Sequence, residues 1–283
     1  MRESSRGPVP KTAFRDALFM ESVAARPIRI LTEYTEPLAR LRREGVGDTI
    51  VIFGSARIEP RDRALEKLRR LEKARGKGKS AERQSALRNA RSAVEMSRYY
   101  EDARELSRRL TKWSMTLGDR PRRFVICSGG GPGIMEAANR GAAEAGGKSI
   151  GLSIELPHEQ WPNGYISPEL SFMFHYFFMR KLWFAQLAKA LIVFPGGFGT
   201  MDELWEMLTL LQTGKLQRRN QVLIYGRKYW DKILNWREMV RCGTISEEEY
   251  GLLEFADNVD EAFERIRDWL IAHHKAPDSL LSE

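Results

Sequence analysis

The chain has little cysteine and no long apolar run, and both absences narrow the class of protein. Cys127 and Cys242 are the only cysteines among 283 residues and form no CxxC pair, which excludes a disulfide-rich fold and favours a reducing compartment. No apolar run approaches the roughly 18 residues that span a membrane. The basic first residues contain no apolar stretch of the kind found in secretory signals. We therefore expect a cytoplasmic protein without a membrane segment.

Histidine is also scarce, and its distribution argues against a metal centre. His158, His175, His273 and His274 have no spacing with carboxylates that is typical of metal ligands. The last two are adjacent and are expected to be solvated on a terminal helix. We therefore expect no metal site.

The net charge of +8 is a local feature rather than a property of the whole chain. Residues 61–91 contain twelve Lys/Arg and four Asp/Glu, an excess as large as the net charge of the entire sequence. Such a basic segment is usually a solvated helix face, although basic runs also occur in nucleic-acid-binding proteins. We do not expect nucleic acid as a partner, and salt-dependent binding to a generic duplex would distinguish the two interpretations.

Short apolar runs alternate with amphipathic stretches along most of the chain. This pattern predicts an α/β fold, a Rossmann-like, doubly wound parallel sheet with helices on both faces. The predicted strands are 49–53, 124–128, 149–154, 191–194, 222–225 and 252–256. The predicted helices between and after them are 134–145, 180–190, 200–213, 230–240 and 259–273, and an apolar stretch at 172–178 precedes the second of these.

Two helical segments are predicted outside this alternation. Residues 1–47 form an N-terminal helical extension, with apolar side chains at helical spacing. Residues 58–95 are charged and rich in Ala, Leu and Arg, which predicts a basic helical insertion after the first strand, broken at 76–80. The Rossmann-like nucleotide-binding domain then covers residues 48–275, and residues 276–283 form a C-terminal tail.

The first of two glycine-rich turns, Gly129-Gly130-Gly131-Pro132-Gly133, follows a predicted strand and opens a helix. Backbone N–H groups at such a helix start accept an anion, and glycine lets the main chain approach a ligand closely. The turn is not a dinucleotide fingerprint, because Ile134 stands where the third glycine would be required, and it is not a Walker A loop. Alone, it is weak evidence, because some such turns only allow close helix–strand packing.

The second turn, residues 195–200, occupies the same strand–turn–helix position and adds the Thr200 hydroxyl. Two such turns at the carboxyl ends of parallel strands point to one ligand-binding crevice. Glu203 follows one turn into the helix. It either faces this crevice or only complements the positive helix end, and the pattern leaves both interpretations open.

These residues resemble the LOG (Lonely Guy) family, the cytokinin riboside 5′-monophosphate phosphoribohydrolases and their bacterial AMP-nucleosidase-like relatives. Residues 129–135, which read GGGPGIM, stand in the place of the family's GGGxxGxM-type loop and are one residue shorter than that pattern. The PGGxGTxxE loop stands here as 195–203 and the Arg-Lys pair as Arg180-Lys181, and the resemblance covers roughly 48–275. It implies an N-glycosidase that hydrolyses AMP or an N6-modified AMP to free base and ribose 5-phosphate. Relatives have also been labelled lysine decarboxylases, but no lysine stands out as a Schiff-base candidate, and we expect no cofactor.

Carried over residue by residue, the resemblance makes Arg180 and Glu203 the catalytic pair. A carboxylate stabilises the oxocarbenium-like transition state of a breaking ribosyl bond, and the arginine fork suits a phosphate or leaving group. The alternative for Arg180 is a surface cation at a helix start, where the dipole disfavours it. The residues that the resemblance assigns to substrate binding are Ser55, Gly130, Gly131, Gly133, Met135, Glu159, Lys181, Gly196, Gly197, Gly199, Thr200 and Thr209, with Glu159 matched only loosely.

The chain also departs from the short members of this family. Phe178-Met179 replace the His and acidic or amide residue that many of them have before Arg180, which points to different base recognition. The extra helices resemble the longer bacterial branch, so we do not expect cytokinin activation as the biological role. The resemblance further implies a homodimer or higher homo-oligomer, for which the apolar helix 199–213 suits an interface. The alternative function is a non-catalytic carrier of a nucleotide or of the molybdenum cofactor, which would not need Glu203.

Overall fold

A seven-stranded parallel sheet forms the centre of the molecule in the computed structural model, which describes residues 10–73, 81–118, 121–157, 161–216 and 220–274. The strand order is β4-β3-β2-β1-β5-β6-β7, and every neighbouring pair is parallel. The strands are β1 (Thr49–Phe53), β2 (Val125–Ser128), β3 (Ser149–Ile154), β4 (Ser171–Phe174), β5 (Ala188–Val193), β6 (Gln221–Tyr225) and β7 (Leu253–Ala256). The predicted Rossmann-like α/β fold is confirmed.

The direction in which the sheet grows reverses between β1 and β5. The chain adds β2, β3 and β4 on one side of β1, then returns to the other side of β1 and adds β5, β6 and β7. The register places Phe53 beside Val193 at the carboxyl ends of the two central strands. Ligands of open α/β sheets bind in the crevice at such a reversal, so the fold itself indicates where a site should lie.

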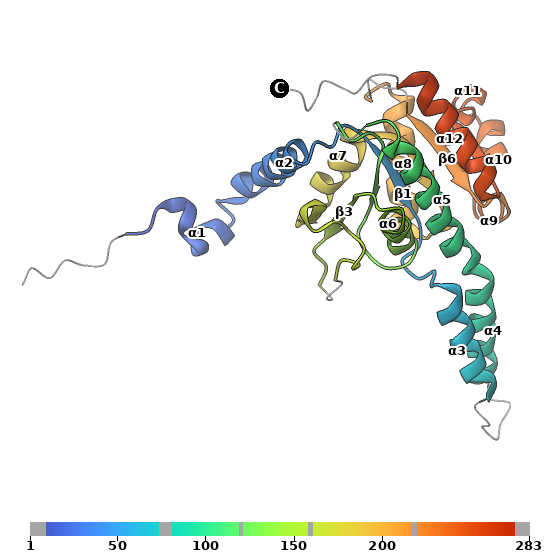
Figure 1. The fold of residues 1–283 in the computed structure, drawn as a ribbon. Helices are drawn as coiled ribbons and strands as arrows, with labels where there is room; N and C mark the ends of the chain where they lie inside the picture. Colours follow the sequence, from blue (N-terminus) through green and yellow to red (C-terminus); the bar gives the residue numbers. More distant parts are fainter. Residues whose placement is uncertain (1–9, 74–80, 119–120, 158–160, 217–219, 275–283) are drawn as a thin grey trace, which may run out of the picture.

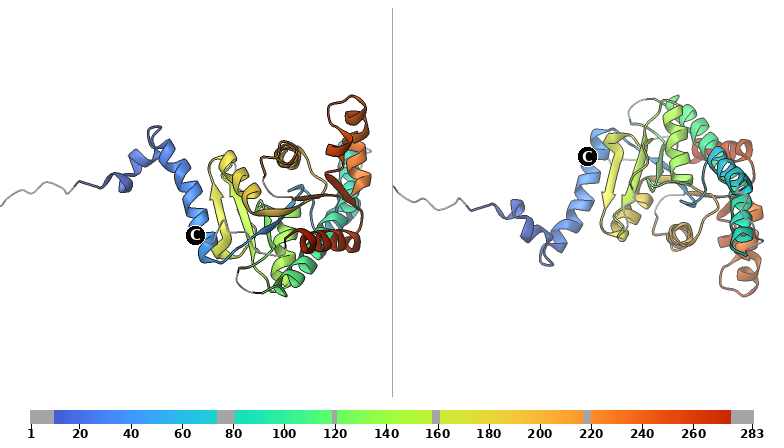
Figure 2. Two further views of the ribbon diagram at one scale, coloured as in Figure 1. Left: turned by 90° about the horizontal axis from the view of Figure 1, so that it is seen from above. Right: turned by 90° about the horizontal axis from the view of Figure 1, so that it is seen from below.

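Helices cover both faces of the sheet (Figures 1 and 2). Those on one face are α5 (Arg98–Met115), α6 (Ile134–Glu144) and α12 (Val259–His273). Those on the other face are α2 (Arg26–Arg43), α7 (Phe177–Leu187), α8 (Phe198–Gln212), α9 (Arg227–Ile233) and α10 (Trp236–Arg241). Side chains alternate along β1. Ile50 and Ile52 therefore pack in the core on the face covered by α5, α6 and α12, whereas Val51 and Phe53 pack in the core on the opposite face. The short helices are η1 (Ala13–Arg15), α1 (Ala17–Glu21), η2 (Pro168–Leu170) and α11 (Glu247–Tyr250).

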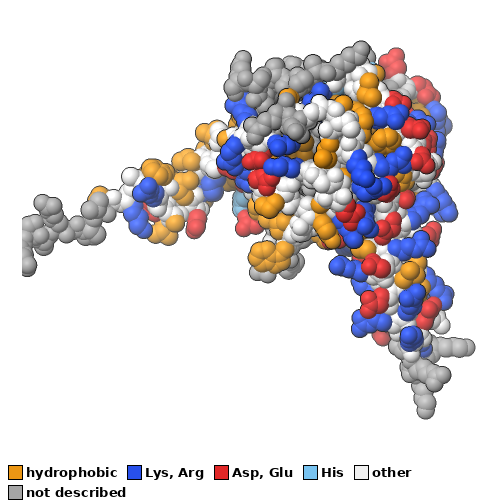
Figure 3. Space-filling model, viewed as in Figure 1, with side chains coloured by type: hydrophobic (Ala, Val, Ile, Leu, Met, Phe, Trp, Pro, Cys, Tyr) orange, Lys and Arg blue, Asp and Glu red, His pale blue; other side chains and the backbone are white. Residues whose placement is uncertain are grey.

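The insertion after β1 forms a helical hairpin that projects from the body (Figure 1). Its arms are α3 (Arg61–Lys73) and α4 (Ala81–Met96), as expected for a helical insertion at this place. The expected break at 76–80 lies outside the described residues. Acidic side chains are interspersed among the basic ones on the hairpin surface (Figure 3).

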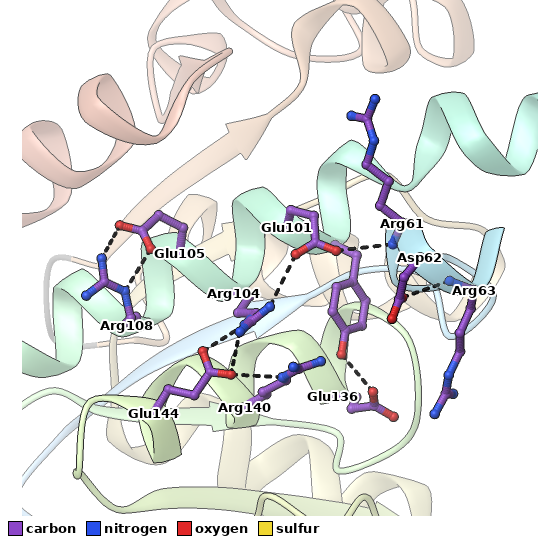
Figure 4. A network of polar contacts seen from close by, with 11 residues as sticks. Arg61, Asp62, Arg63, Glu101, Arg104, Glu105, Arg108, Glu136, Arg140 and Glu144 are labelled. Carbon is purple, nitrogen blue, oxygen red and sulfur yellow. Dashed lines mark hydrogen bonds and ion pairs between the residues drawn. The ribbon is translucent and has the colours of Figure 1, made fainter. Parts of the chain in front are cut away.

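A network of polar contacts ties the inserted segment to α6 (Figure 4). Tyr100 of α5 is fully buried, and its hydroxyl donates a hydrogen bond of 2.7 Å to Glu136. Arg104 donates to both carboxylate oxygens of Glu144 at 2.7 and 2.6 Å, and Arg140 donates to the same carboxylate at 2.9 Å. The N–H of Arg61, at the start of α3, donates a hydrogen bond of 3.1 Å to Glu101 of α5, so the insertion is joined through α5 to the helix that the first glycine-rich turn opens.

Along its length, α2 contacts the body of the molecule. Leu41 is buried, and the indole of Trp183 donates a hydrogen bond of 3.0 Å to the carbonyl of Glu33. Farther out, Leu18 and Val23 are 84% and 88% exposed, on the part of the chain that stands away from the sheet in Figure 2. No helix within the described ranges is both long and apolar enough to cross a bilayer.

Two parts of the sheet differ from the sequence prediction. The helix expected over 180–190 ends at Leu187, and Ala188–Ala190 already belong to β5. Alanine and lysine favour helix, but pairing with β1 and full burial of this segment override that propensity. The apolar stretch 172–178, for which we predicted no strand, contains the edge strand β4. The domain boundaries stay predictions.

Candidate active site

A cavity of about 640 Å³ opens at the carboxyl edge of the sheet, outside β1 and β5. The two loops that begin there are joined by a hydrogen bond of 3.0 Å from the Ser55 N–H to the Pro195 carbonyl. The residues that line the cavity are Phe53, Gly54, Ser55, Ala56, Arg57, Gly129, Met135, Arg180, Phe184, Gly196, Gly197, Phe198, Gly199, Thr200, Met201, Glu203, Tyr229 and Ile233. The two glycine-rich turns thus meet in one crevice.

The start of α8 forms one wall of this cavity. Gly197 is its N-cap, and no side chain caps the helix. The N–H groups of Phe198, Gly199 and Thr200 therefore have no acceptor within the helix. A side chain on Gly196 would overlap the Thr200 hydroxyl, so glycine lets the turn close tightly at this point. An uncapped helix start with a glycine-rich approach is a binding site for an anion.

The first turn supports the opposite wall. Gly133 has a φ of +72°, and a Cβ at this position would overlap the backbone of Ser55. The N–H of Ile134 donates a hydrogen bond of 3.1 Å to the Ser55 carbonyl, which joins the start of α6 to the β1 loop. Gly129 and Met135 line the cavity. The predicted contacts Gly130, Gly131 and Gly133 do not line the cavity and instead shape the turn behind Gly129 and Met135.

Buried polar side chains hold this first turn in place. The hydroxyl of Ser128 donates a hydrogen bond of 2.7 Å to Asn139 Oδ1, and both residues are fully buried. The Asn163 amide donates to the carbonyls of Gly130 and Gly131, each at 3.0 Å, and to Asn139 Oδ1 at 2.9 Å. The turn is therefore preorganised before any ligand binds.

Arg180 and Glu203, the predicted catalytic pair, lie together in the cavity. Arg180 Nη2 is 2.8 Å from Glu203 Oε1, and their side chains are only 14% and 7% exposed. Rings of Phe177 and Phe184 lie 5.1 and 5.6 Å from the guanidinium. Arg180 is thus not a surface cation, and Glu203 does more than complement the helix dipole, because it faces the cavity.

Burial dominates the protonation of Glu203. Loss of hydration raises the pKa of its carboxyl from 4.5 to about 7, although the positive charges of Arg180 and Lys181 act in the opposite direction. A carboxyl group that changes charge near neutrality can stabilise a cation when ionised and can also exchange a proton with water. This combination of burial, titration and a guanidinium partner is the chemical core of the site.

Five predicted substrate contacts do not line this cavity: Gly130, Gly131 and Gly133 of the first turn, and also Lys181 and Thr209. Lys181 turns to the outer side of α7, where its ammonium lies 2.8 Å from Asp202 and 3.0 Å from Glu206. Thr209 donates a hydrogen bond of 2.7 Å to the Trp205 carbonyl and borders a different pocket. Glu159 lies outside the described residues. The predicted residues of the β1 and β5 loops do line the cavity; these are Ser55, Gly196, Gly197, Gly199 and Thr200.

Several lining residues were not identified from the sequence. Arg57 could have been, since it follows Ser55 by two residues in the same loop. Tyr229 and Ile233 carry no motif and reach the cavity because α9 folds back beside β5, where the Tyr229 hydroxyl donates a hydrogen bond of 2.8 Å to the Gly196 carbonyl. Phe198, 93% exposed, occupies the variable position of its motif.

The described residues offer no alternative metal or lysine chemistry in this region. Among them, no group of three or more His, Cys, Asp or Glu side chains is placed to hold a metal ion. No lysine is among the residues that line the cavity in the described ranges. The described residues that line the cavity bring to it a carboxyl group, guanidinium groups, hydroxyl groups and backbone N–H groups.

Two solved structures are similar to this chain in their arrangement. The molybdenum cofactor binding protein from Rippkaea orientalis is 17% identical, with a TM-score of 0.43 over 60% of this chain and 86% of that chain. The Moco carrier protein from Chlamydomonas reinhardtii is 18% identical, with a TM-score of 0.44 over 80% of this chain and 98% of that chain. Likeness at this level says nothing of what the chain binds.

Sequence comparison identifies relatives more directly. The cytokinin riboside 5′-monophosphate phosphoribohydrolase LOG1 of Arabidopsis thaliana is 29% identical over 97 residues, which is 34% of this chain and 45% of that protein. The match therefore spans less than half the length of this relative. A family model described as possible lysine decarboxylase matches residues 135–266, a range that includes Arg180 and the whole second turn. The chain is thus similar to the LOG family over part of its length.

Proposed function

We propose that the protein hydrolyses the N-glycosidic bond of a purine nucleoside 5′-monophosphate, AMP or an N6-modified AMP, to free base and ribose 5-phosphate. The observation that carries this proposal is the buried Glu203 carboxyl, 2.8 Å from the Arg180 guanidinium, in the same cavity as the uncapped start of α8. The helix start supplies an anion site and Glu203 supplies a charge for the reacting centre. The substrate must therefore combine a phosphate with a bond whose cleavage develops positive charge.

The reaction develops that charge on the ribose. As the C1′–N9 bond breaks, its electron pair leaves with the base, and C1′ becomes oxocarbenium-like. The ionised Glu203 carboxylate stabilises this cation and orients a water molecule toward C1′. Water oxygen forms the new bond to C1′, and one water proton passes through Glu203 to the departing base. Atoms and charge then balance as AMP plus water giving adenine plus ribose 5-phosphate.

Arg180 has two roles in this scheme. Its hydrogen bond of 2.8 Å fixes the orientation of Glu203, and its remaining N–H groups are available to electron density on the base or phosphate. The Nε atom of Arg180 is buried without a hydrogen-bond partner among the described residues, which is costly unless a ligand supplies an acceptor. Arg180 is thus placed to gain a contact when substrate binds.

The description of the family model as possible lysine decarboxylase is not supported by the residues of the cavity. Schiff-base chemistry requires an amine within reach of the reacting carbon. The nearby Lys181 is engaged by two carboxylates on the outer side of α7, in a separate groove lined also by Phe178 and Leu182. A nucleotide hydrolase is the better account of the residues that are present.

Incubation with a panel of nucleoside 5′-monophosphates, with free base measured by chromatography, tests this proposal. We expect release of a purine base together with an equal amount of ribose 5-phosphate. Binding of nucleotides without any base release would contradict the proposal and favour a carrier. For a substitution of Glu203, the matched control is Glu206→Gln, because Glu206 lies on the same helix but pairs with Lys181 outside the cavity.

We further propose that the chain acts as a homodimer. The outer face of α7 presents Phe178 and Leu182, which are 49% and 37% exposed, beside a groove of about 560 Å³ that Leu210 of α8 also lines. Exposed apolar area of this kind suits an interface between copies. Light scattering at micromolar concentration should give twice the chain mass, and Leu182→Glu should reduce it to the monomer mass. A monomer mass for the unmodified protein would contradict this proposal.

A further inference from the structure

Arg57 is the one charged residue of the cavity lining that has no ion-pair partner among the described residues. The charged side chains of that lining are Arg57, Arg180 and Glu203. Because Arg180 and Glu203 pair with each other, Arg57 leaves the cavity with one uncompensated positive charge. A cation at the mouth of a cavity attracts anionic ligands to it.

The backbone of Arg57 is fixed although its side chain is exposed. Its N–H donates a hydrogen bond of 3.1 Å to the Ser55 hydroxyl, and the next residue, Ile58, is buried with 6% exposure. Ser55 is in turn bonded to the Pro195 carbonyl at 3.0 Å. Arg57 is therefore held in the loop that directly adjoins the second glycine-rich turn, with its guanidinium left available.

Acidic residues that follow Arg57 in the chain are committed to other partners. Glu59 forms an ion pair with Lys67. Asp62 accepts a hydrogen bond of 2.7 Å from the N–H of Arg63, at the start of α3 (Figure 4). These carboxylates stabilise the beginning of the hairpin and do not neutralise Arg57.

We propose that Arg57 binds the phosphate of the substrate together with the free N–H groups at the start of α8, and so selects phosphorylated over unphosphorylated ligands. This inference rests on the proposed function for the identity of the substrate. A phosphomonoester carries close to two negative charges, and a guanidinium fork binds two of its oxygens at once. The helix start alone supplies only partial positive charge. Arg57 supplies the full charge that this dianion requires.

The test compares ligand binding by the full chain and three variants, Arg57→Gln, Arg57→Lys and Arg63→Gln. Calorimetry would measure the affinity for AMP, for ribose 5-phosphate and for adenosine. Loss of one charge-assisted contact predicts about 10- to 100-fold weaker binding of both phosphorylated ligands to Arg57→Gln. Affinity for adenosine should stay the same. Arg57→Lys should recover part of the loss, since it keeps the charge but not the fork, and Arg63→Gln should behave as the unmodified chain.

A kinetic readout separates this role from a structural one. If Arg57 contacts the phosphate equally in the ground and transition states, Arg57→Gln raises KM for AMP and leaves kcat within about threefold. Unchanged AMP affinity, or an equal loss for adenosine, would overturn the proposal. Should the unmodified protein bind AMP without releasing base, the proposed hydrolysis fails, whereas the binding series still decides the role of Arg57.

Discussion

Replacing Glu203 with glutamine removes one charge from the cavity and almost nothing else. The amide has nearly the same size as the carboxyl group and can still accept a hydrogen bond from Arg180. What disappears is the negative charge that stabilises the ribosyl cation. Loss of a preorganised electrostatic stabiliser lowers kcat by about 10²- to 10³-fold. The affinity for AMP should change little, because the proposed phosphate site lies at the start of α8.

The pH dependence gives this prediction a second, independent readout. Because the pKa of Glu203 is raised to about 7, the unmodified enzyme should lose kcat as the pH falls below 7, by about tenfold per unit. The glutamine variant should not show this acidic limb. Its residual activity should be flat across the same range.

Protein stability should shift in the opposite direction with pH. The folded-state pKa of Glu203, about 7, lies above its ordinary value of 4.5, so the folded state holds more protons between these values. The resulting stabilisation is fully present below pH 4.5 and is lost as the pH rises through 7. The increase in pKa corresponds to about 3 kcal/mol. The unfolding free energy of Glu203→Gln should therefore rise relative to that of the unmodified chain by up to about 3 kcal/mol as the pH increases from about 4.5 to 8.

Turnover by chromatography and unfolding by urea titration, each measured from pH 4.5 to 8, check both effects. Glu206→Gln serves as the control, since it alters an acid of the same helix outside the cavity. Near-normal turnover of Glu203→Gln with an unchanged acidic limb would refute the catalytic role. A stability difference that does not vary with pH would refute the account of its titration.

Two other substitutions test the scaffold of the site. Gly196→Ala places a methyl group against the Thr200 hydroxyl and should raise KM for AMP about tenfold or more. The control is Gly164→Ala, which places its methyl group in open space and should leave KM unchanged. Equal KM values for the two variants would contradict the tight turn at Gly196. Tyr100→Phe removes the 2.7 Å hydrogen bond to Glu136 and should lower the unfolding free energy by about 1–3 kcal/mol in urea titration. Tyr34→Phe, at a site 38% exposed, is its control, and equal losses would contradict the anchoring role of Tyr100.

The parts of the site predictable from sequence are those that local motifs encode. A strand followed by glycines and a helix fixes its own geometry over about ten residues, so the two turns were placed correctly. Glu203 followed from the second glycine-rich turn, because a residue about one turn into α8 lies near the carboxyl edge of the sheet. The meeting of both turns in one crevice followed from the parallel fold.

The parts that the sequence did not reveal depend on contacts between distant segments. Ala188–Ala190 have helical propensity and become strand only because β1 pairs with them. Lys181 follows Arg180 directly, yet successive helical residues point about 100° apart, so only Arg180 faces the cavity. Tyr229 reaches the site through the packing of α9 against the second turn, which no local pattern encodes.

The most direct test of the central claim is a side-by-side measurement of base release from AMP and adenosine by the unmodified protein. In the proposed complex the phosphate contacts the start of α8, at a distance from the bond that breaks, and its binding energy would contribute to the transition state. We therefore expect kcat/KM for AMP to exceed that for adenosine by at least about 10³-fold, with free adenine and ribose 5-phosphate as the products. Equal values for the two substrates, or no adenine from AMP, would contradict the assignment of this cavity as a nucleoside monophosphate hydrolase site.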